Sequence, residues 1–349
     1  MIVLGIESSC DETAVALLQG NKSTFRVLSS GMATQQAIHT RYGGVVPEVA
    51  ARNHIAAIIP LVKKTLGSRI PDCIAVTAGP GLITSLLVGV HTARALAYIY
   101  KKQLVRVNHI EGHIYSNWFS STGIRFPALA LIVSGGHTEL ILMKGHGLYK
   151  KVGATLDDAA GEAFDKAAKI MDLGYPGGPA IAQRAKYGDP KAIPLPIPML
   201  HSHDFRFSFS GLKTAVLYCI RDKKKQKIYS DAMRDDICAS FQHSVVTVLV
   251  KKTCAAAQRY KVKSVLLGGG VAANLALRES LTNAVSTVPG KSLLAIAPLH
   301  YCTDNAAMIA LAGYFRAKEK KFVSPLRCDA NPAWELPSMK DAHDYYNPR

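Results

Sequence analysis

The chain has 349 residues, 48% hydrophobic and 19% charged, with a mean hydropathy of +0.11, which excludes a disordered protein and predicts two domains or one double-lobed unit. Its 42 Lys and Arg exceed its 25 Asp and Glu, and the net charge of +17 indicates either a polyanionic partner such as RNA or a surface that is lysine-rich throughout. No apolar run reaches the roughly 20 residues of a membrane span, residues 1–6 favour a buried strand over a signal peptide, and seven scattered cysteines are typical of reduced cytoplasmic thiols.

Strand and helix patterns alternate along the chain, which predicts an α/β fold with helices covering a sheet. In the first third we expect strands at 2–6, 14–18, 74–77 and 104–107, and helices at 47–66, at 82–98 and from 109 on. Further along we expect strands at 128–133, 139–143, 205–209, 264–267 and 293–297. The remaining helices are expected at 156–173 with Asp157 as cap, after 179, from 210, at 231–260, from 271, and up to about 317, followed by an extended surface segment from 324.

Two strand–turn–strand segments of similar pattern lie about 127 residues apart. The first is residues 2–18 with a polar turn at 7–13, and the second is residues 128–143 with a turn at 134–138. Two lobes that each begin with such a hairpin indicate an internal duplication, and a chance similarity of two hairpins is the alternative.

His109 and His113 are four residues apart, just after an apolar strand pattern. On a helix they lie on one face, one turn apart, where two imidazoles can share a metal ion. The alternative is two unrelated histidines on a half-exposed helix. Glu111 lies two residues after the first histidine, about 200° around the helix, so the pattern lacks the general base of an H-E-x-x-H peptidase.

Three further carboxylates are candidates for chemistry, and one of them could complete the metal site. Asp304 follows a strand and precedes a helix, so it is either a helix cap or a third ligand in a two-histidine, one-carboxylate site. Asp11 and Glu12 lie in the first hairpin turn, where polar residues are ordinary.

Glycine-rich turns at 134–136, 177–178 and 268–270 let backbone N–H groups approach phosphate oxygens. The third turn leads from a strand into a helix N-terminus, which favours negative charge. None of the three matches a P-loop or a dinucleotide-binding fingerprint.

Seven segments together resemble the universal tRNA N6-adenosine threonylcarbamoyltransferase family in its bacterial TsaD form, in the family's order from residue 3 to about 316. They are Gly5-Ile-Glu-Ser-Ser-Cys-Asp-Glu-Thr13, Gly79-Pro-Gly81, Asn108-His-Ile-Glu-Gly-His113, Val133-Ser-Gly-Gly-His-Thr138, Phe205-Arg-Phe-Ser-Phe-Ser-Gly-Leu-Lys213, Gly268-Gly-Gly-Val-Ala-Ala-Asn274 and Cys302-Thr-Asp-Asn305. Members were formerly described as sialoglycoprotein endopeptidases, an activity that the position of Glu111 disfavours.

The resemblance implies the actin-like ATPase (ASKHA) architecture, with two RNase H-like lobes and a central cleft. We expect an N-terminal lobe at 1–108 plus about 305–330, a C-terminal lobe at 109–304, and an extended tail at 331–349. The implied reaction transfers a threonylcarbamoyl group from threonylcarbamoyl-AMP to N6 of adenosine 37 in tRNAs that read codons beginning with A.

The same resemblance implies the site residues. His109, His113 and Asp304 would hold one divalent metal, iron or zinc, and the adenylate site would be lined by Ile132, Val133, Ser134, Gly135, Gly136, Asp165, Gly178 and Asn274. The default for Asp165 from its helix alone is a solvated face. We hypothesise that the metal orients and polarises the threonylcarbamoyl group, that the turn at 134–137 faces the phosphate, and that Asp11 or Glu12 takes up or relays the amine proton. One departure is that Ile181 and Ala182 are apolar where some relatives carry an acidic nucleoside contact.

The implied partners are the anticodon stem-loop of tRNA, a degenerate paralogous protein of the TsaB type and a small ATPase of the TsaE type, with no membrane. The alternatives are an ATP hydrolase or small-molecule kinase of the same fold, which needs no transition-metal site, and a nucleotide-binding scaffold that assembles other proteins.

Overall fold

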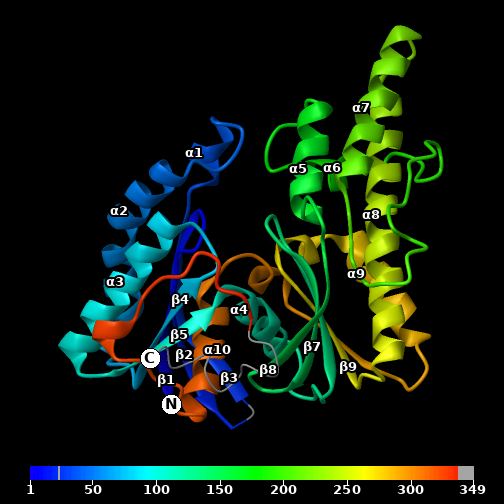
Figure 1. Ribbon diagram of the computed structural model, residues 1–349. Coiled ribbons are helices and arrows are strands. Elements are labelled where there is room, and N and C mark those ends of the chain that lie inside the picture. The colour runs from blue at the N-terminus through cyan, green and yellow to red at the C-terminus, as the bar shows by residue number, and fades with distance from the viewer. Residues whose placement is uncertain (23, 337–349) are drawn as a thin grey trace. The chain divides into compact units, whose positions relative to one another are not determined.

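The computed structural model describes residues 1–22 and 24–336 and contains two compact units, each built on a five-stranded sheet (Figure 1). Unit 1 comprises Met1–Gly123, Lys144–Lys150 and the described residues from 297 on, and unit 2 comprises Ile124–Met143 and Lys151–Ile296. The chain therefore leaves unit 1 and returns to it twice.

The two sheets share one strand order. In the first, the order is β3-β2-β1-β4-β5, formed by β1 (Ile2–Glu7), β2 (Glu12–Asn21), β3 (Thr24–Thr34), β4 (Cys73–Gly79) and β5 (Gln103–Asn108). In the second, it is β8-β7-β6-β9-β10, formed by β6 (Ala128–Val133), β7 (Thr138–Gly145), β8 (Leu148–Ala154), β9 (Ser264–Gly268) and β10 (Leu293–Ile296). In each sheet the first two strands form an antiparallel hairpin, and the fourth and fifth strands are added in parallel. The predicted pair of hairpins is confirmed, and the shared order supports the duplication.

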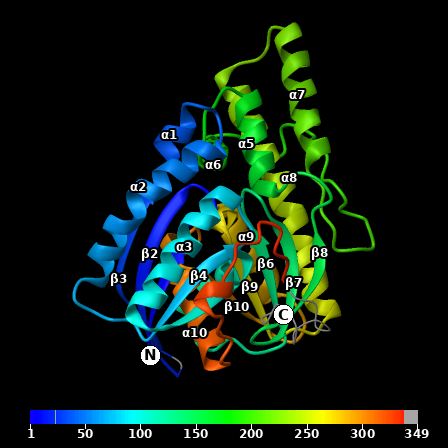
Figure 2. The ribbon, with the colours of Figure 1, turned by 60° about the vertical axis from the view of Figure 1, so that its left-hand side comes forward.

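The helices of unit 1 cover both faces of its sheet (Figures 1 and 2). On one side lie α2 (Pro47–Leu66) and α3 (Ile83–Tyr100), and on the other α10 (Ala306–Lys318), which packs against α4 (His109–Tyr115). Strand β2 alternates accordingly, because Val15 and Leu17 join the core that includes α2 and α3, whereas Ala14 and Ala16 pack against the start of α10. The short helix α1 (Gln36–Thr40) precedes α2.

Unit 2 carries five α-helices: α5 (Ala160–Ile170), α6 (Gly177–Arg184), α7 (Ser210–Lys225), α8 (Asp231–Arg259) and α9 (Leu275–Ser286). Helix α8 packs against β6, α6, α7 and α9, and α5 packs against α6 and α7. Short 3₁₀ helices lie at Ser116–Phe119, Gly270–Ala273, Leu299–Tyr301 and Pro325–Arg327. No helix of the described chain has the length and apolar character needed to cross a membrane.

Three predicted features were wrong. Residues 205–209 form no strand and make a single bridge between Thr155 and Phe207. The helix expected at 156–173 begins at Ala160, because the Asp157 carboxylate accepts hydrogen bonds from the backbone N–H of Phe209 (2.7 Å) and the hydroxyl of Ser210 (2.7 Å) instead of capping its own helix. The helix expected from residue 271 begins at Leu275, after a 3₁₀ turn.

The compact units divide the chain at other positions than the expected lobes. Helix α4 and residues 297–304 belong to unit 1, because α4 packs on α10. Of the expected tail, residues 331–336 lie on unit 1, where Trp334 is buried and Asn331 donates its N–H to Ala78 O, and residues 337–349 lie outside the described part of the chain. All seven cysteines are free, as expected.

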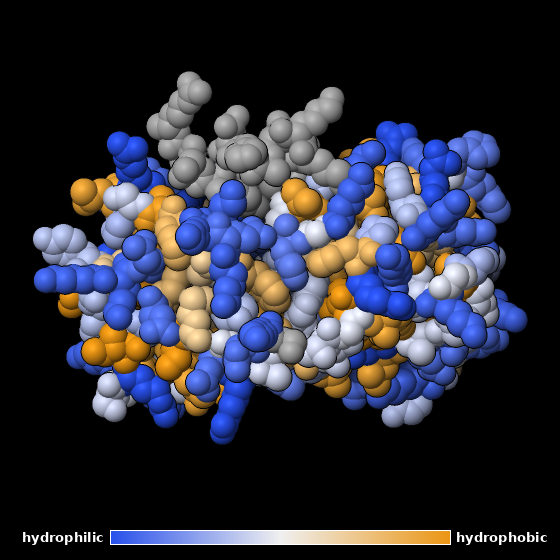
Figure 3. Space-filling model, turned by 90° about the horizontal axis from the view of Figure 1, so that it is seen from below, coloured by the Kyte–Doolittle hydropathy of each residue, from blue (hydrophilic) through white to orange (hydrophobic). Residues whose placement is uncertain are grey.

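Hydrophilic residues dominate the face seen in Figure 3, and the hydrophobic residues among them gather in small groups. Such a surface is ordinary for a folded protein.

Candidate functional site

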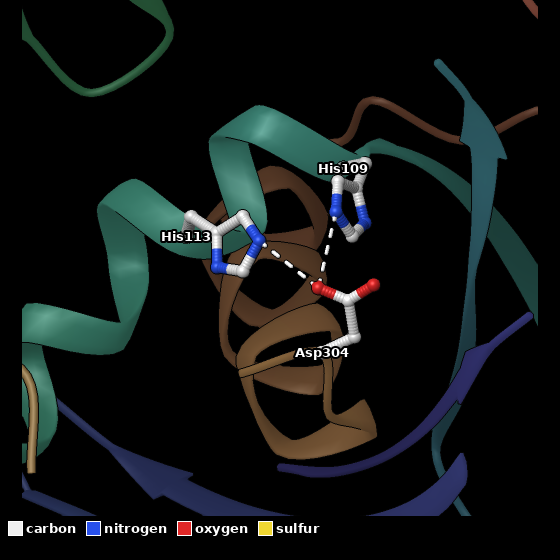
Figure 4. Close-up of side chains that lie close together, drawn as sticks. All are labelled: His109, His113 and Asp304. Carbon is white, nitrogen blue, oxygen red and sulfur yellow. Dashed lines mark ion pairs between the residues drawn. The ribbon is translucent and has the colours of Figure 1, made fainter. Parts of the chain in front are cut away.

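His109, His113 and Asp304 converge in unit 1 (Figure 4). Asp304 Oδ1 lies 3.4 Å from His109 Nε2 and 3.2 Å from His113 Nε2, and one ligand atom from each of the three residues lies within 4.8 Å of the others. Both imidazoles are buried, with His109 only 6% exposed. The structure therefore brings together the three residues expected to hold a metal.

Helix caps on either side orient these side chains. Asn108 ends β5, and its side chain accepts hydrogen bonds from the N–H groups of Ile110 and Glu111, which starts α4 at His109. At the other end, Asn305 and not Asp304 caps α10, accepting from Met308 N at 2.9 Å. The choice left open by the sequence is resolved, since the Asp304 carboxylate is not used as a cap and faces the histidines.

The close packing of β1 and α4 against α10 sets the distance between the two histidines and Asp304. A Cβ on Gly5 of β1 would lie 2.3 Å from the carbonyl oxygen of Ala306, and one on Gly112 of α4 would lie 2.7 Å from Ile309. At Gly5 the obstacle is backbone, so only glycine permits β1 to approach α10 this closely, whereas at Gly112 the Ile309 side chain would have to shift. The same contacts place the segment before α10 opposite His109 and His113.

Glu7, the last residue of β1, is a site residue that the sequence did not single out. Its buried carboxylate faces His109 Nδ1 at 3.0 Å and accepts from Thr77 Oγ1 and Ser9 N, both at 2.6 Å. Because β1, β4 and β5 run parallel, their carboxyl ends meet at one edge of the sheet. The sequence did contain a signal for this contact: Glu7 directly follows one predicted strand and His109 lies just after another.

The electrostatics of the cluster follow from burial and mutual charge. Burial alone would lower the pKa of His109, but Asp304 and Glu7 outweigh it and hold that pKa well above its usual value. Burial would likewise raise the pKa of Asp304, but His109 holds it far below its usual range. Burial lowers the pKa of His113, which keeps that imidazole neutral at pH 7.

The donor set fits a divalent metal ion. Nδ1 of His113 is buried without a hydrogen-bond partner among the described residues, and the polar contact of its buried Nε2 is the ion pair with Asp304; a buried nitrogen without a partner in a native fold calls for an explanation. Two imidazole nitrogens and one carboxylate oxygen are ligands that zinc and iron accept. The contact between Glu7 and His109 Nδ1 is the second-sphere arrangement that orients metal-ligating histidines.

Asp11 and Glu12 lie at the first hairpin turn, beside this cluster. Burial, Asp304 and Asp11 together raise the pKa of Glu12 to about 9. The turn is held by His54 of α2, whose Nδ1 lies 2.7 Å from Thr13 Oγ1 and whose Nε2 lies 3.0 Å from Cys10 O. The carboxylates are thus attached to an anchored turn.

Glu111 points away from the metal-ligand candidates. It is buried in an ion pair with Arg316, and it accepts a hydrogen bond from Tyr149 Oη at 2.7 Å. Its role is structural, which confirms that α4 lacks the base of a zinc peptidase.

The residues expected to line the adenylate site all lie in unit 2. The side chains of Ile132 and Val133 are buried in β6 and are not available to a ligand. The turn that follows is closed by a hydrogen bond of 2.8 Å from Ser134 N to His137 O. A Cβ added to Gly135 or Gly136 would meet no atom within 4 Å, so the backbone there is open to close approach.

The other residues expected at the adenylate site, Asp165, Gly178 and Asn274, lie at or contact the N-terminal ends of helices. Asp165 Oδ1 accepts from Gly177 N at 2.7 Å at the start of α6, and burial raises its pKa despite that bond. A Cβ on Gly178 would meet open space. Asn274 caps α9 by accepting from Leu277 N and donates to Gln242 Oε1 at 2.7 Å, so its amide is already engaged.

The chain matches the family model described as tRNA N6-adenosine threonylcarbamoyltransferase over residues 26–311. A protein of that name from Symbiobacterium thermophilum is 49% identical, with 90% of this chain and 91% of the relative covered. One from Bacillus subtilis is 48% identical, with 97% of each covered. Among solved structures, HypF from T. kodakarensis superposes with a TM-score of 0.59 at 14% identity, covering 91% of this chain and 48% of HypF, so this chain spans about half of that protein. This likeness concerns the fold alone, which is the actin-like ATPase architecture.

Proposed function

The chain belongs to the tRNA N6-adenosine threonylcarbamoyltransferase family, and we infer that it transfers the threonylcarbamoyl group from threonylcarbamoyl-AMP to N6 of adenosine 37 in tRNAs reading codons that begin with A. The observation that carries this inference is the family match over residues 26–311, together with about 48% identity over nearly the full length of the relatives. The product is threonylcarbamoyladenosine.

The reaction exchanges one bond to the carbamoyl carbon. The N6 amine forms a bond to that carbon, the bond from the carbon to the phosphate oxygen breaks, AMP leaves with the electron pair, and the amine loses a proton. Because the substrate is an activated mixed anhydride, the protein mainly has to orient it and stabilise negative charge.

We propose that His109, His113 and Asp304 bind one divalent metal, iron or zinc. Their convergence and the burial of both His113 ring nitrogens, with Nε2 facing Asp304, support this assignment. A bound divalent ion would supply Lewis-acid stabilisation of substrate oxygens. Glu7 orients His109 through its Nδ1, which directs Nε2 toward Asp304.

We propose that the loop after β6 and the start of α6 bind the adenylate. The open space at Gly135, Gly136 and Gly178 supports close approach of backbone N–H groups to phosphate oxygens. Asp165 holds the first turn of α6 in place and thereby positions Gly178. With Ala182 apolar, nucleoside recognition has to come from other groups.

We further propose that Asp11 or Glu12 takes up or relays the amine proton, since both stand on the anchored turn beside the metal-ligand candidates. Because its pKa is raised to about 9, Glu12 is protonated at neutral pH and would have to give up its own proton as it receives another. The expected partners are tRNA, a degenerate paralogue of the TsaB type and a small ATPase of the TsaE type, in the cytoplasm. The kinase and scaffold alternatives are not favoured, because the relatives over the whole chain are transferases.

A transfer assay tests the proposed function. Radiolabelled threonine, bicarbonate, ATP and unmodified tRNA are incubated with the adenylate-forming enzyme and the partner proteins, with and without this chain. Label should enter tRNA only when the chain is present, and His109→Ala should abolish it while leaving complex assembly unchanged. No incorporation with a partner set that is competent with another family member would exclude the transferase, and full activity of the His109→Ala variant would exclude the metal assignment.

A further inference from the structure

Helices α7 and α8 form a hairpin that extends past the strands of their sheet (Figures 1 and 2). Helix α7 has 16 residues, a length of about 24 Å at 1.5 Å per residue. The end of this hairpin, residues 217–234, which we call the α7–α8 tip, contains Arg221, Lys223, Lys224, Lys225, Lys227 and Arg234 against only Asp222 and Asp231. It is the densest run of basic residues in the sequence.

The lysines of this tip have no acidic partners in the described chain. Lys223, Lys224, Lys225 and Lys227 make no ion pair with any carboxylate of the described chain, and residues 224–228 are all exposed. By contrast, Lys166 of α5 is neutralised by Asp158 and Glu162. Because these four positive charges lie within residues 223–227, they repel each other.

The helix dipole explains part of this arrangement, because cations are favoured in the last turn of α7. It does not explain the exposed apolar side chains beside them. Leu217, Tyr218 and Ile228 are 47%, 51% and 47% exposed. The Arg221 guanidinium lies 4.7 Å from the Tyr218 ring, and Lys224 Nζ lies 5.3 Å from the Tyr229 ring.

Cations interleaved with exposed aromatic rings fit a nucleic acid, whose phosphates take the charge and whose sugars and bases contact the rings. We propose that the α7–α8 tip is a docking surface for the phosphate backbone of the tRNA substrate. This proposal rests on the proposed transferase function.

The packing of unit 2 gives such docking a consequence. Helix α7 packs on α5, which carries Asp165, and α8 packs on α6, which begins at Gly177. A tRNA held at the tip is therefore held by the same helices that position the proposed adenylate loops. Contact at the tip should set affinity for tRNA without taking part in the chemical step.

The test compares two triple variants that remove equal charge from unit 2. Lys224→Gln/Lys225→Gln/Lys227→Gln neutralises the tip, and Lys251→Gln/Lys261→Gln/Lys263→Gln neutralises exposed lysines on α8 and just beyond its other end. Each is assayed as the full chain with its partner proteins, at several salt concentrations, after melting curves have shown that the fold is unchanged.

For the tip variant we expect KM for tRNA to rise about tenfold or more with kcat unchanged, and the slope of log affinity against log salt to fall by roughly 2 to 3. The control variant should change KM less than twofold. Equal effects of both variants, or an unchanged KM and salt slope in the tip variant, would overturn the tip proposal. Transfer by the wild type in the same assay would still support the proposed function. Absence of transfer by the wild type would instead remove the function. Loss of binding to anionic phosphatidylglycerol vesicles with KM for tRNA unchanged would assign the tip to a membrane surface and also overturn the proposal.

Discussion

Replacing Glu7 by glutamine tests whether the buried carboxylate behind His109 sets the metal site. The change preserves shape and removes one acceptor oxygen. An amide nitrogen in place of Oε1 would face the N–H of Ser9, 2.6 Å away, donor against donor. An amide nitrogen in place of Oε2 would face His109 Nδ1, which would then have to accept, so that the ring proton moves to Nε2, the nitrogen directed at Asp304.

Either arrangement weakens the proposed ligand. Loss of a second-sphere partner typically costs about 10- to 100-fold in metal affinity, or about 1.4 to 2.8 kcal/mol. Titration of the metal-free chain with zinc or cobalt against a chromophoric chelator measures that affinity. Thr77→Val is the matched control, because it removes one donor to Glu7 but keeps the carboxylate, and it should change affinity less than about threefold.

A second readout separates this effect from general destabilisation. Imidazole ¹⁵N spectra of the metal-free protein are recorded at a pH above the raised pKa of His109, where the ring carries a single proton. They should locate that proton on Nδ1 in the wild type and on Nε2 in Glu7→Gln. Metal affinity within twofold of wild type in Glu7→Gln, with an unchanged tautomer, would refute the reasoning and reduce Glu7 to a structural carboxylate.

Two further changes test the scaffold around the sites. Gly5→Ala places a Cβ 2.3 Å from the Ala306 carbonyl oxygen. We therefore expect the free energy of unfolding, measured with urea, to fall by roughly 1 to 3 kcal/mol, and metal binding to weaken. Gly211→Ala is the control, because a Cβ there meets nothing within 4 Å, and equal stability of the two variants would contradict the close-packing argument. Asp157→Ala should cost about 1 kcal/mol as a lost helix cap. Partial burial raises the pKa of Asp157, but hydrogen bonds from Ser208 and the start of α7 have the larger combined effect and lower it. The contribution of Asp157 to stability is therefore present at neutral pH and is lost as the pH falls below about 4. A difference in stability between Asp157→Ala and wild type that persists at low pH would exclude the charge as its source.

The sequence predicted the metal-ligand candidates because local rules suffice for them. The spacing of His109 and His113 places two imidazoles on one helix face whatever the rest of the fold. Asp304 stayed ambiguous between cap and ligand because the adjacent Asn305 can cap equally well, and only the backbone decides which residue does.

Non-local features escaped prediction. The role of Glu7 depends on β1 and β5 ending at the same sheet edge with β4 between them, which follows from strand order and not from spacing. Strand β3 lies at a sheet edge and has no fully buried residue, and its apolar residues do not alternate with polar ones beyond Val27, so no strand pattern marks it. Asp157 bonds to residues about 50 positions away, a contact that outweighed its predicted cap.

The hairpin turns after β1 and β6 occupy the same position in the two sheets but differ in length and side-chain content. In sheet 1 the hairpin pairs Glu7 with Ala14 and leaves six residues in the turn, enough for Asp11 and Glu12 to present carboxylates beside the metal-ligand candidates. In sheet 2 it pairs Val133 with Thr138 and leaves four, two of them glycines open to solvent. A longer turn with acidic side chains suits cation and proton chemistry, whereas a short turn of bare backbone suits an anion. The difference in turn length and side-chain content, on one strand order, therefore fits the proposed metal-binding role of unit 1 and the proposed adenylate-binding role of unit 2.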